Sequence, residues 1–215
     1  FDLPVCKSRK IQVDFQGGEV SSDAGVLLVR QADRKLKLTE ELHRRLSDPR
    51  RQASCDHRQI ELLRQRIYGL ALGYEDLNDH ETLRRDIALQ TAAGTDHELA
   101  SASTLCRWEN RADRETAGLI AGWMIELFIQ SYKKAPAELI LDFDATNDAV
   151  HGKQDGRFFH GYYDQYCFLP LYVFCGERLL VSYLRPSNQD GARHAWAILA
   201  LLVKRLRQVW PKVKI

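Results

Sequence analysis

The sequence has few of the features that mark secreted, membrane-spanning or metal-clipped proteins. Its five cysteines are scattered and contain no C-x-x-C pair, so we expect neither a disulfide framework nor a zinc ribbon. The longest strongly apolar stretch, residues 195–203, is too short to cross a bilayer. The first ten residues lack the basic-then-apolar order of a secretory signal. We therefore expect a cytoplasmic protein that does not engage a membrane.

The net charge is small as well, at +2, and does not indicate a nucleic-acid partner by itself. The basic residues are nevertheless clustered. One cluster lies near residues 204–214, and a denser one consists of Arg44, Arg45, Arg50, Arg51, Arg58, Arg64 and Arg66. Such clusters either follow a phosphate backbone or form solvated helix faces. The charge pattern alone leaves both interpretations open.

The amino-terminal segment predicts a strand followed by a helix. Residues 9–16 alternate apolar and polar side chains, which is typical of a strand, and the glycines at 17–18 would end it. The next segment, 21–36, has helical spacing. Its N-cap is expected among Ser21, Ser22 and Asp23, because short oxygen-bearing side chains accept hydrogen bonds from the first turn.

From residue 38 to about 134 the pattern is helical throughout. Four helices are predicted, at 56–73, 78–94, 101–112 and 115–132. Ser103 is expected to cap the third, and the fourth is apolar enough to be largely buried. This region is the expected DNA-binding part of the chain, should nucleic acid be the partner.

Beyond Pro136 the pattern changes to strands. Three strands are predicted, at 138–145, 166–175 and 178–185. An amphipathic helix follows at 187–211 and ends at Pro211, and residues 212–215 start a fourth strand. Pro170 is expected at a bulge or an edge. A first strand, an antiparallel pair and a helix crossing to a further strand open the ribonuclease-H-like fold. The expected class is therefore α+β or α/β, with domains 1–37, 38–135 and 136–215.

Two carboxylates lie at the end of the first of these strands, in the segment LILDFDATND. Residues i and i+2 of a strand share a face, so Asp142 and Asp144 point the same way while Phe143 points into apolar packing. Carboxylates carried into a sheet core would be costly unless they were paired or bound to metal. Their oxygens suit a hard divalent cation.

Three interpretations of this acidic pair compete. In the first, one aspartate caps a turn and the other pairs with an arginine. In the second, the stretch DFDAT is the Asp-x-Asp-x-Thr motif of a phosphoaspartate-type phosphohydrolase, with Asp142 as nucleophile. In the third, an aspartate on the first strand of the sheet holds Mg²⁺ for phosphodiester chemistry, as in metal-dependent polynucleotidyl transferases. The 135 preceding residues and the antiparallel hairpin that follows favour the third, because the phosphohydrolase motif normally opens a parallel sheet.

Five motifs in order give the chain a family resemblance over almost its whole length. They are GYEDLNDHETLRRD (73–86), SASTLCRWENR (101–111), LDFDATNDAVHGKQ (141–154), HGYYDQYCFLPLYVFCG (160–176) and LRPSNQDGA (184–192). With them the sequence resembles the DDE transposases of bacterial insertion sequences. The resemblance implies a DNA transposase of a mobile element that binds the element's terminal repeats and target DNA, assembles as a homo-oligomer on DNA, and associates with the nucleoid.

The resemblance also implies site residues. The family's first catalytic aspartate ends a strand in an Asp-x-Thr context, which corresponds to Asp144; Asp142 is the less favoured candidate. The second aspartate and the glutamate have no counterpart among residues 1–215, so the expected two-Mg²⁺ site is incomplete. The sequence is accordingly expected to be an amino-terminal portion of a transposase, inactive alone. A non-catalytic DNA-binding remnant is the other outcome considered.

The segment 101–112 resembles a recognition helix. Thr104, Arg107 and Arg111 follow i, i+3, i+7 spacing, which places them on one face that can enter a major groove. The competing interpretation is an ordinary surface helix anchored in the core by Trp108. Both are carried forward.

Overall fold

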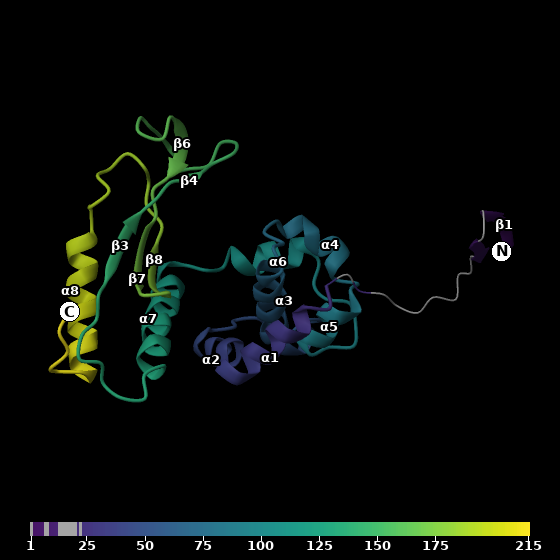
Figure 1. Cartoon of the computed structure of the whole chain (residues 1–215), viewed down its shortest axis with the longest axis horizontal. Helices are drawn as coiled ribbons and strands as arrows, with labels where there is room; N and C mark the ends of the chain where they lie inside the picture. Colours follow the sequence, from purple (N-terminus) through teal and green to yellow (C-terminus); the bar gives the residue numbers. More distant parts are fainter. Residues whose placement is uncertain (1, 7–8, 13–20, 22) are drawn as a thin grey trace. The chain divides into compact units, whose positions relative to one another are not determined.

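The computed structural model describes residues 2–6, 9–12, 21 and 23–215, and it divides the chain into two compact units, 1–113 and 114–215 (Figure 1). The predicted domain boundaries at 37/38 and 135/136 differ from this division, because helix α7 packs with the carboxy-terminal strands rather than with the helices before it.

The first unit begins with an antiparallel hairpin, strands β1 (Asp2–Cys6) and β2 (Arg9–Gln12). The predicted strand at 9–16 therefore has its first four residues in β2, while 13–16 and the glycines at 17–18 lie outside the described residues. The first helix, α1 (Val26–Leu36), starts later than predicted, with Gly25 as its N-cap. Asp23 does not cap it; its carboxylate accepts a hydrogen bond from the hydroxyl of Tyr74 at 3.0 Å. Ser22 also lies outside the described residues.

Five more helices and two short 3-10 turns complete the first unit. They are α2 (Leu38–Arg45), η1 (Gln52–Ser54), α3 (Gln59–Ala71), η2 (Leu77–Asp79), α4 (His80–Leu83), α5 (Ile87–Ala93) and α6 (Ala102–Glu109). Helix α3 contacts α1, α2, α5 and α6, so it forms the centre of the unit. The apolar core includes Val26, Tyr68 and Leu89, all almost completely buried.

A buried polar network links three of these helices. Asp33, only 7% exposed, accepts hydrogen bonds from the Thr39 backbone at 2.8 Å and from the hydroxyls of Thr39 and Tyr68, both at 2.6 Å. Burial and the neighbouring carboxylate raise the pKa of Tyr68, so the phenol keeps its proton and remains a donor. The network therefore satisfies a buried charge that would otherwise be costly.

Local polar side chains shift the predicted helix limits. Helix α3 begins at Gln59 because Glu61 reaches back to the Arg58 backbone N–H at 2.9 Å, which makes the predicted start at residue 56 wrong by three positions. The predicted helix 78–94 is broken, since Asp86 accepts a hydrogen bond from the Leu89 N–H and starts α5. Gly94 ends α5 in the left-handed region, as its sequence position suggests.

The second unit contains two helices and two three-stranded sheets. Its elements are α7 (Arg114–Gln130), β3 (Asp142–Ala145), β4 (Asp148–Ala149), β5 (Phe158–His160), β6 (Gln165–Phe168), β7 (Leu171–Cys175), β8 (Arg178–Tyr183) and α8 (Ala195–Val209). The larger sheet has the order β3-β7-β8 with both pairs antiparallel. The antiparallel pair expected from segments 166–175 and 178–185 is confirmed by β7 and β8, and β7, not β3, is the middle strand. Glu138 also forms a parallel bridge to Lys214, where the fourth strand was expected to begin.

The predicted single strand 166–175 is wrong, because the chain divides at Leu169–Pro170. Residues before this point form β6 and belong to the smaller sheet, β4-β6-β5, while residues after it form β7. Proline has no N–H to donate to a sheet ladder, so it ends one strand where the next begins. The smaller sheet was not predicted, since β4 and β5 have only two and three residues.

Helices α7 and α8 both contribute buried residues to one apolar core with the larger sheet, and both lie beside that sheet in Figure 1. The core includes Phe128, Val173, Leu202 and Leu206, all at most 3% exposed. An Arg205–Glu126 pair joins the two helices through two contacts of 2.6 and 2.7 Å. The prediction that helix 115–132 is largely buried is wrong within this unit, because only three of its residues are buried.

The two units together are a mixed α+β structure, consistent with a partial ribonuclease-H-like fold. None of the helices in the described part of the chain has both the length and the apolar content that crossing a bilayer requires.

Candidate nucleic-acid interface

Helix α6 (Ala102–Glu109) carries two of the three predicted DNA-binding residues, Thr104 and Arg107, whereas Arg111 lies two residues beyond its end and so departs from the predicted helix face. Its N-cap is Ser101, whose hydroxyl accepts from the Thr104 N–H at 3.4 Å; the predicted cap, Ser103, is wrong and is exposed instead. Leu105 is fully buried, and Trp108 packs beside it against the same apolar cluster. The helix is therefore anchored by Leu105 and Trp108, while Thr104 and Arg107 form a polar face beside them.

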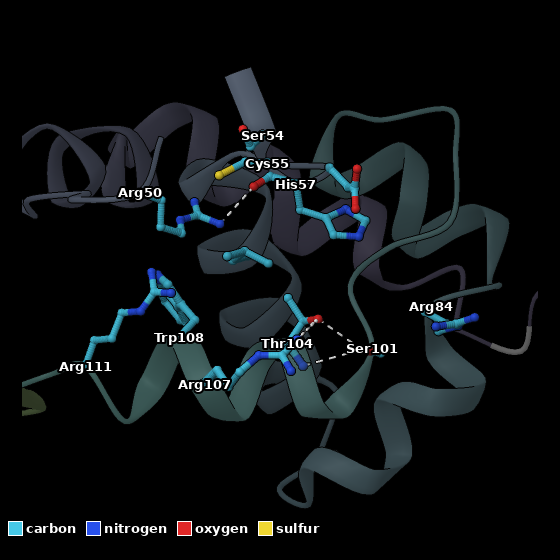
Figure 2. A pocket seen from close by; sticks show the side chains of 12 residues that line it. Arg50, Ser54, Cys55, His57, Arg84, Ser101, Thr104, Arg107, Trp108 and Arg111 are labelled. Atoms are coloured by element: carbon cyan, nitrogen blue, oxygen red, sulfur yellow. Dashed lines mark hydrogen bonds between the residues drawn. The ribbon is translucent and has the colours of Figure 1, made fainter. Parts of the chain in front are cut away.

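This polar face borders a pocket of about 380 Å³ in the first unit (Figure 2). Thr104, Arg107 and Arg111 all line it, so the structure brings the three predicted residues to one surface. Arg50 and Arg84 line it too, from the segment before α3 and from the end of α4. We call this group the arginine pocket.

The four arginines differ in how far their charge is already balanced. Arg50 forms an ion pair with Asp48 at 2.7 Å, and this contact holds the pKa of the Asp48 carboxyl far below its usual range. Arg84 is paired with Glu98 at 2.8 Å. Arg107 donates to the Thr104 hydroxyl at 3.1 Å. Among the described residues, no carboxylate lies within ion-pair distance of Arg107 or Arg111, so their charges are available to an external anion.

The acidic strand lies in the second unit and is not carried into a sheet core. Asp142 and Asp144 are both exposed, on the face of β3 opposite the partly buried Phe143. Their positions across the ladder are Phe174 and Tyr172. The two carboxylates are thus close neighbours on an open sheet face, which removes the desolvation cost that a buried pair would incur.

Beyond β8, Arg185 organises the loop that follows. It is 1% exposed and donates to the carbonyls of Leu169 at 2.8 Å, Gly191 at 3.1 Å and Arg193 at 2.6 Å. Burial lowers the pKa of its guanidinium. These bonds hold the loop so close to β3 that a side chain at Gly191 would contact Ala145. Sequence reasoning missed this role, because a buried arginine without a carboxylate partner has no local signature.

Comparison with known proteins identifies one family. The family model described as transposase DDE domain group 1 matches residues 3–215. No significant match is found among curated proteins or among solved structures. The matched region covers both units, including α6 and the acidic strand β3, and the chain therefore belongs to the transposase DDE domain group 1 family.

Proposed function

We propose that the chain acts in transposition and binds the ends of an insertion sequence through the arginine pocket. The observation that carries this proposal is the meeting of Thr104 and Arg107 of α6 with Arg111, just beyond the helix, at one pocket, where neither arginine has an ion-pair partner among the described residues. Guanidinium groups bind phosphate oxygens in bidentate geometry, and they also read guanine in the major groove. Terminal repeats and target DNA are the proposed partners, with a homo-oligomer assembled on them.

The catalytic proposal assigns Asp144 as a metal ligand, with Asp142 as the second candidate. Both carboxylates are exposed and share one face, so the donor chemistry fits Mg²⁺, which prefers oxygen ligands and keeps several waters. Bound Mg²⁺ would supply charge stabilisation at the scissile phosphate. The loop tied down by Arg185 lies beside the end of β3, where Gly191 approaches Ala145, the residue after Asp144.

Two Mg²⁺ ions need more carboxylates than β3 provides. We propose that the second aspartate and the glutamate come from further sequence of a full-length transposase, and that residues 1–215 alone do not transpose DNA. The phosphohydrolase alternative is less favoured, because β3 pairs antiparallel with β7. In the other alternative, the chain binds DNA in the same way but takes no part in cleavage.

The binding proposal is tested by fluorescence anisotropy with DNA carrying terminal repeats, titrated with salt. Each lost phosphate contact is expected to reduce the slope of log affinity against log salt by about 1, so Arg107→Ala/Arg111→Ala is expected to reduce it by about 2. The matched control is Arg44→Ala/Arg45→Ala, which removes the same charge from exposed arginines already paired with Glu40 and Glu41. An equal loss in both double variants would contradict a role for the pocket.

A further inference from the structure

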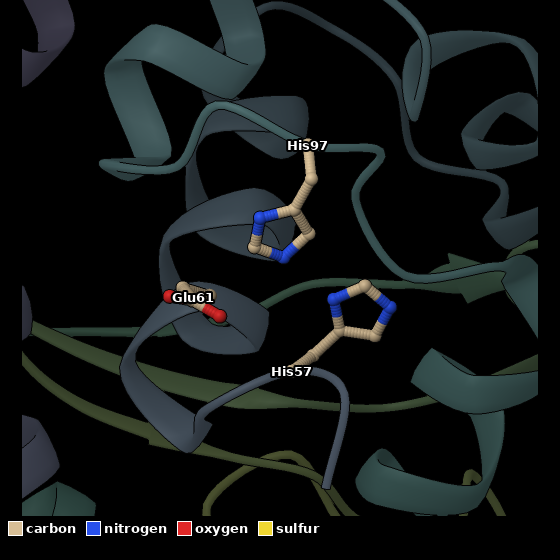
Figure 3. A group of neighbouring side chains, drawn as sticks. All are labelled: His57, Glu61 and His97. Atoms are coloured by element: carbon tan, nitrogen blue, oxygen red, sulfur yellow. The ribbon is translucent and has the colours of Figure 1, made fainter.

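Three potential metal ligands meet in the first unit, from segments far apart in sequence (Figure 3). His57 precedes α3, Glu61 lies in its first turn, and His97 belongs to the segment between α5 and α6. One ligand atom from each lies within 4.8 Å of the other two. The two imidazole rings are stacked, with centroids 5.8 Å apart and planes inclined by 17°.

Glu61 is buried, His57 is half-buried and His97 is exposed, an arrangement that suits an ion bound near the surface. The Glu61 side chain is only 5% exposed; among the described residues its ion-pair partner is Arg58, whose side chain is 67% exposed, and it also accepts a hydrogen bond from the Arg58 backbone N–H. Solvent screens this ion pair, so an entering cation can replace the Arg58 side chain. The His97 side chain is 53% exposed, so the site is open on that side.

We propose that His57, Glu61 and His97 bind one divalent metal ion of the zinc class. Two imidazole nitrogens and one carboxylate are a donor set that Zn²⁺ accepts in tetrahedral geometry, with water as the fourth ligand. The nitrogen donors separate this site from the oxygen-only site proposed at Asp144, since Mg²⁺ takes oxygen ligands. Arg58 is exposed enough to turn into solvent when the cation enters.

Such an ion would join two segments that hydrogen bonds already link. Gln65 of α3 exchanges two hydrogen bonds with the Ala100 backbone, at 2.8 and 3.0 Å. The metal would add an attachment three residues earlier, at His97. Since His57 also lines the arginine pocket, the ion would fix one wall of that pocket. The ion's proposed role is structural, and the site is separate from the acidic strand in the other unit.

The test is equilibrium dialysis of the untagged chain with Zn²⁺ in excess Mg²⁺, together with Co²⁺ absorption spectroscopy. We expect one Zn²⁺ per chain and the strong visible bands of tetrahedral Co²⁺. His57→Ala and His97→Ala are each expected to lower Zn²⁺ affinity by at least about tenfold. His151→Ala is the matched control, because His151 is exposed in the other unit, and it should bind as wild type does.

Three results would overturn the proposal: no stoichiometric Zn²⁺ binding, wild-type affinity in either site variant, or an equal loss in the control. Circular dichroism of each variant shows whether it folds, and His97 is exposed enough that its replacement leaves the core intact. DNA is absent from the assay, so its outcome is independent of whether the arginine pocket binds transposon ends.

Discussion

His80 shows how one buried residue makes stability depend on pH. Its side chain is fully buried, and burial, reinforced by Arg66, lowers its pKa from the usual 6.5. The unfolded chain therefore binds this proton more readily than the folded protein does. The stabilising contribution is complete above about pH 6.5 and is lost as the pH falls through the lower folded-state value.

We expect the urea midpoint of unfolding to fall as the pH is lowered from about 7.5 to about 5.5, and the fall to be smaller in His80→Gln. The pKa of His57 is also lowered by burial, so part of the pH dependence should persist in that variant. His151→Ala serves as the control, with an unchanged slope. An identical pH dependence in His80→Gln and wild type would show that His80 does not contribute.

The identity of important residues was easier to predict than their environment. Strand periodicity placed Asp142 and Asp144 on one face, and helical spacing placed Thr104 with Arg107; both relations hold in the structure. Whether a face is covered depends on distant segments, so the exposure of the two aspartates was not predictable. The approach of His97 to His57 likewise depends on tertiary packing.

At the scale of elements, the lack of a side chain at Gly69 of α3 lets His80 of α4 pack closely against that helix. A methyl group at Gly69 would lie 2.8 Å from the His80 ring, which is fully buried and has no solvent side to move toward. Gly118 in α7 has nothing within 4 Å of the same position. There is therefore no room for a side chain at Gly69, whereas a methyl group fits at Gly118.

We expect Gly69→Ala to lower the free energy of unfolding by about 1–3 kcal/mol through overpacking. Gly118→Ala is expected to raise it by about 0.5–1 kcal/mol, because alanine is the better helix former where space allows. Thermal unfolding followed by circular dichroism measures both. A stabilised Gly69→Ala variant would mean that the helices separate more easily than the contact implies.

Element types were predictable from periodicity, but their interruptions were not. Asp86 and Pro170 each divide a segment whose apolar spacing is continuous, the first by capping a new helix and the second by ending a strand. Neither an aspartate nor a proline always interrupts a helix or strand, so their presence alone does not locate a break. A hydrophobic pattern alone therefore cannot locate such breaks.

For the whole molecule, the fold class followed from the order of elements, and the family from five motifs in sequence. The division at residues 113/114 was not predictable, because α7 is as helical as the segments before it and only its contacts assign it to the sheet. We propose that β3 supplies a metal-binding carboxylate to a DNA-cleaving site, and that Asp144 is this carboxylate.

The most direct test is a cleavage assay on DNA carrying the element's ends, with Mg²⁺, using a full-length transposase that contains these residues. Asp144→Asn is expected to abolish cleavage while DNA binding in a gel shift stays close to wild type, since the change removes charge and almost no volume. Asp142→Asn is expected to retain more activity, and chelating Mg²⁺ should stop the wild-type reaction. Normal cleavage by Asp144→Asn together with an inactive Asp142→Asn would contradict the assignment.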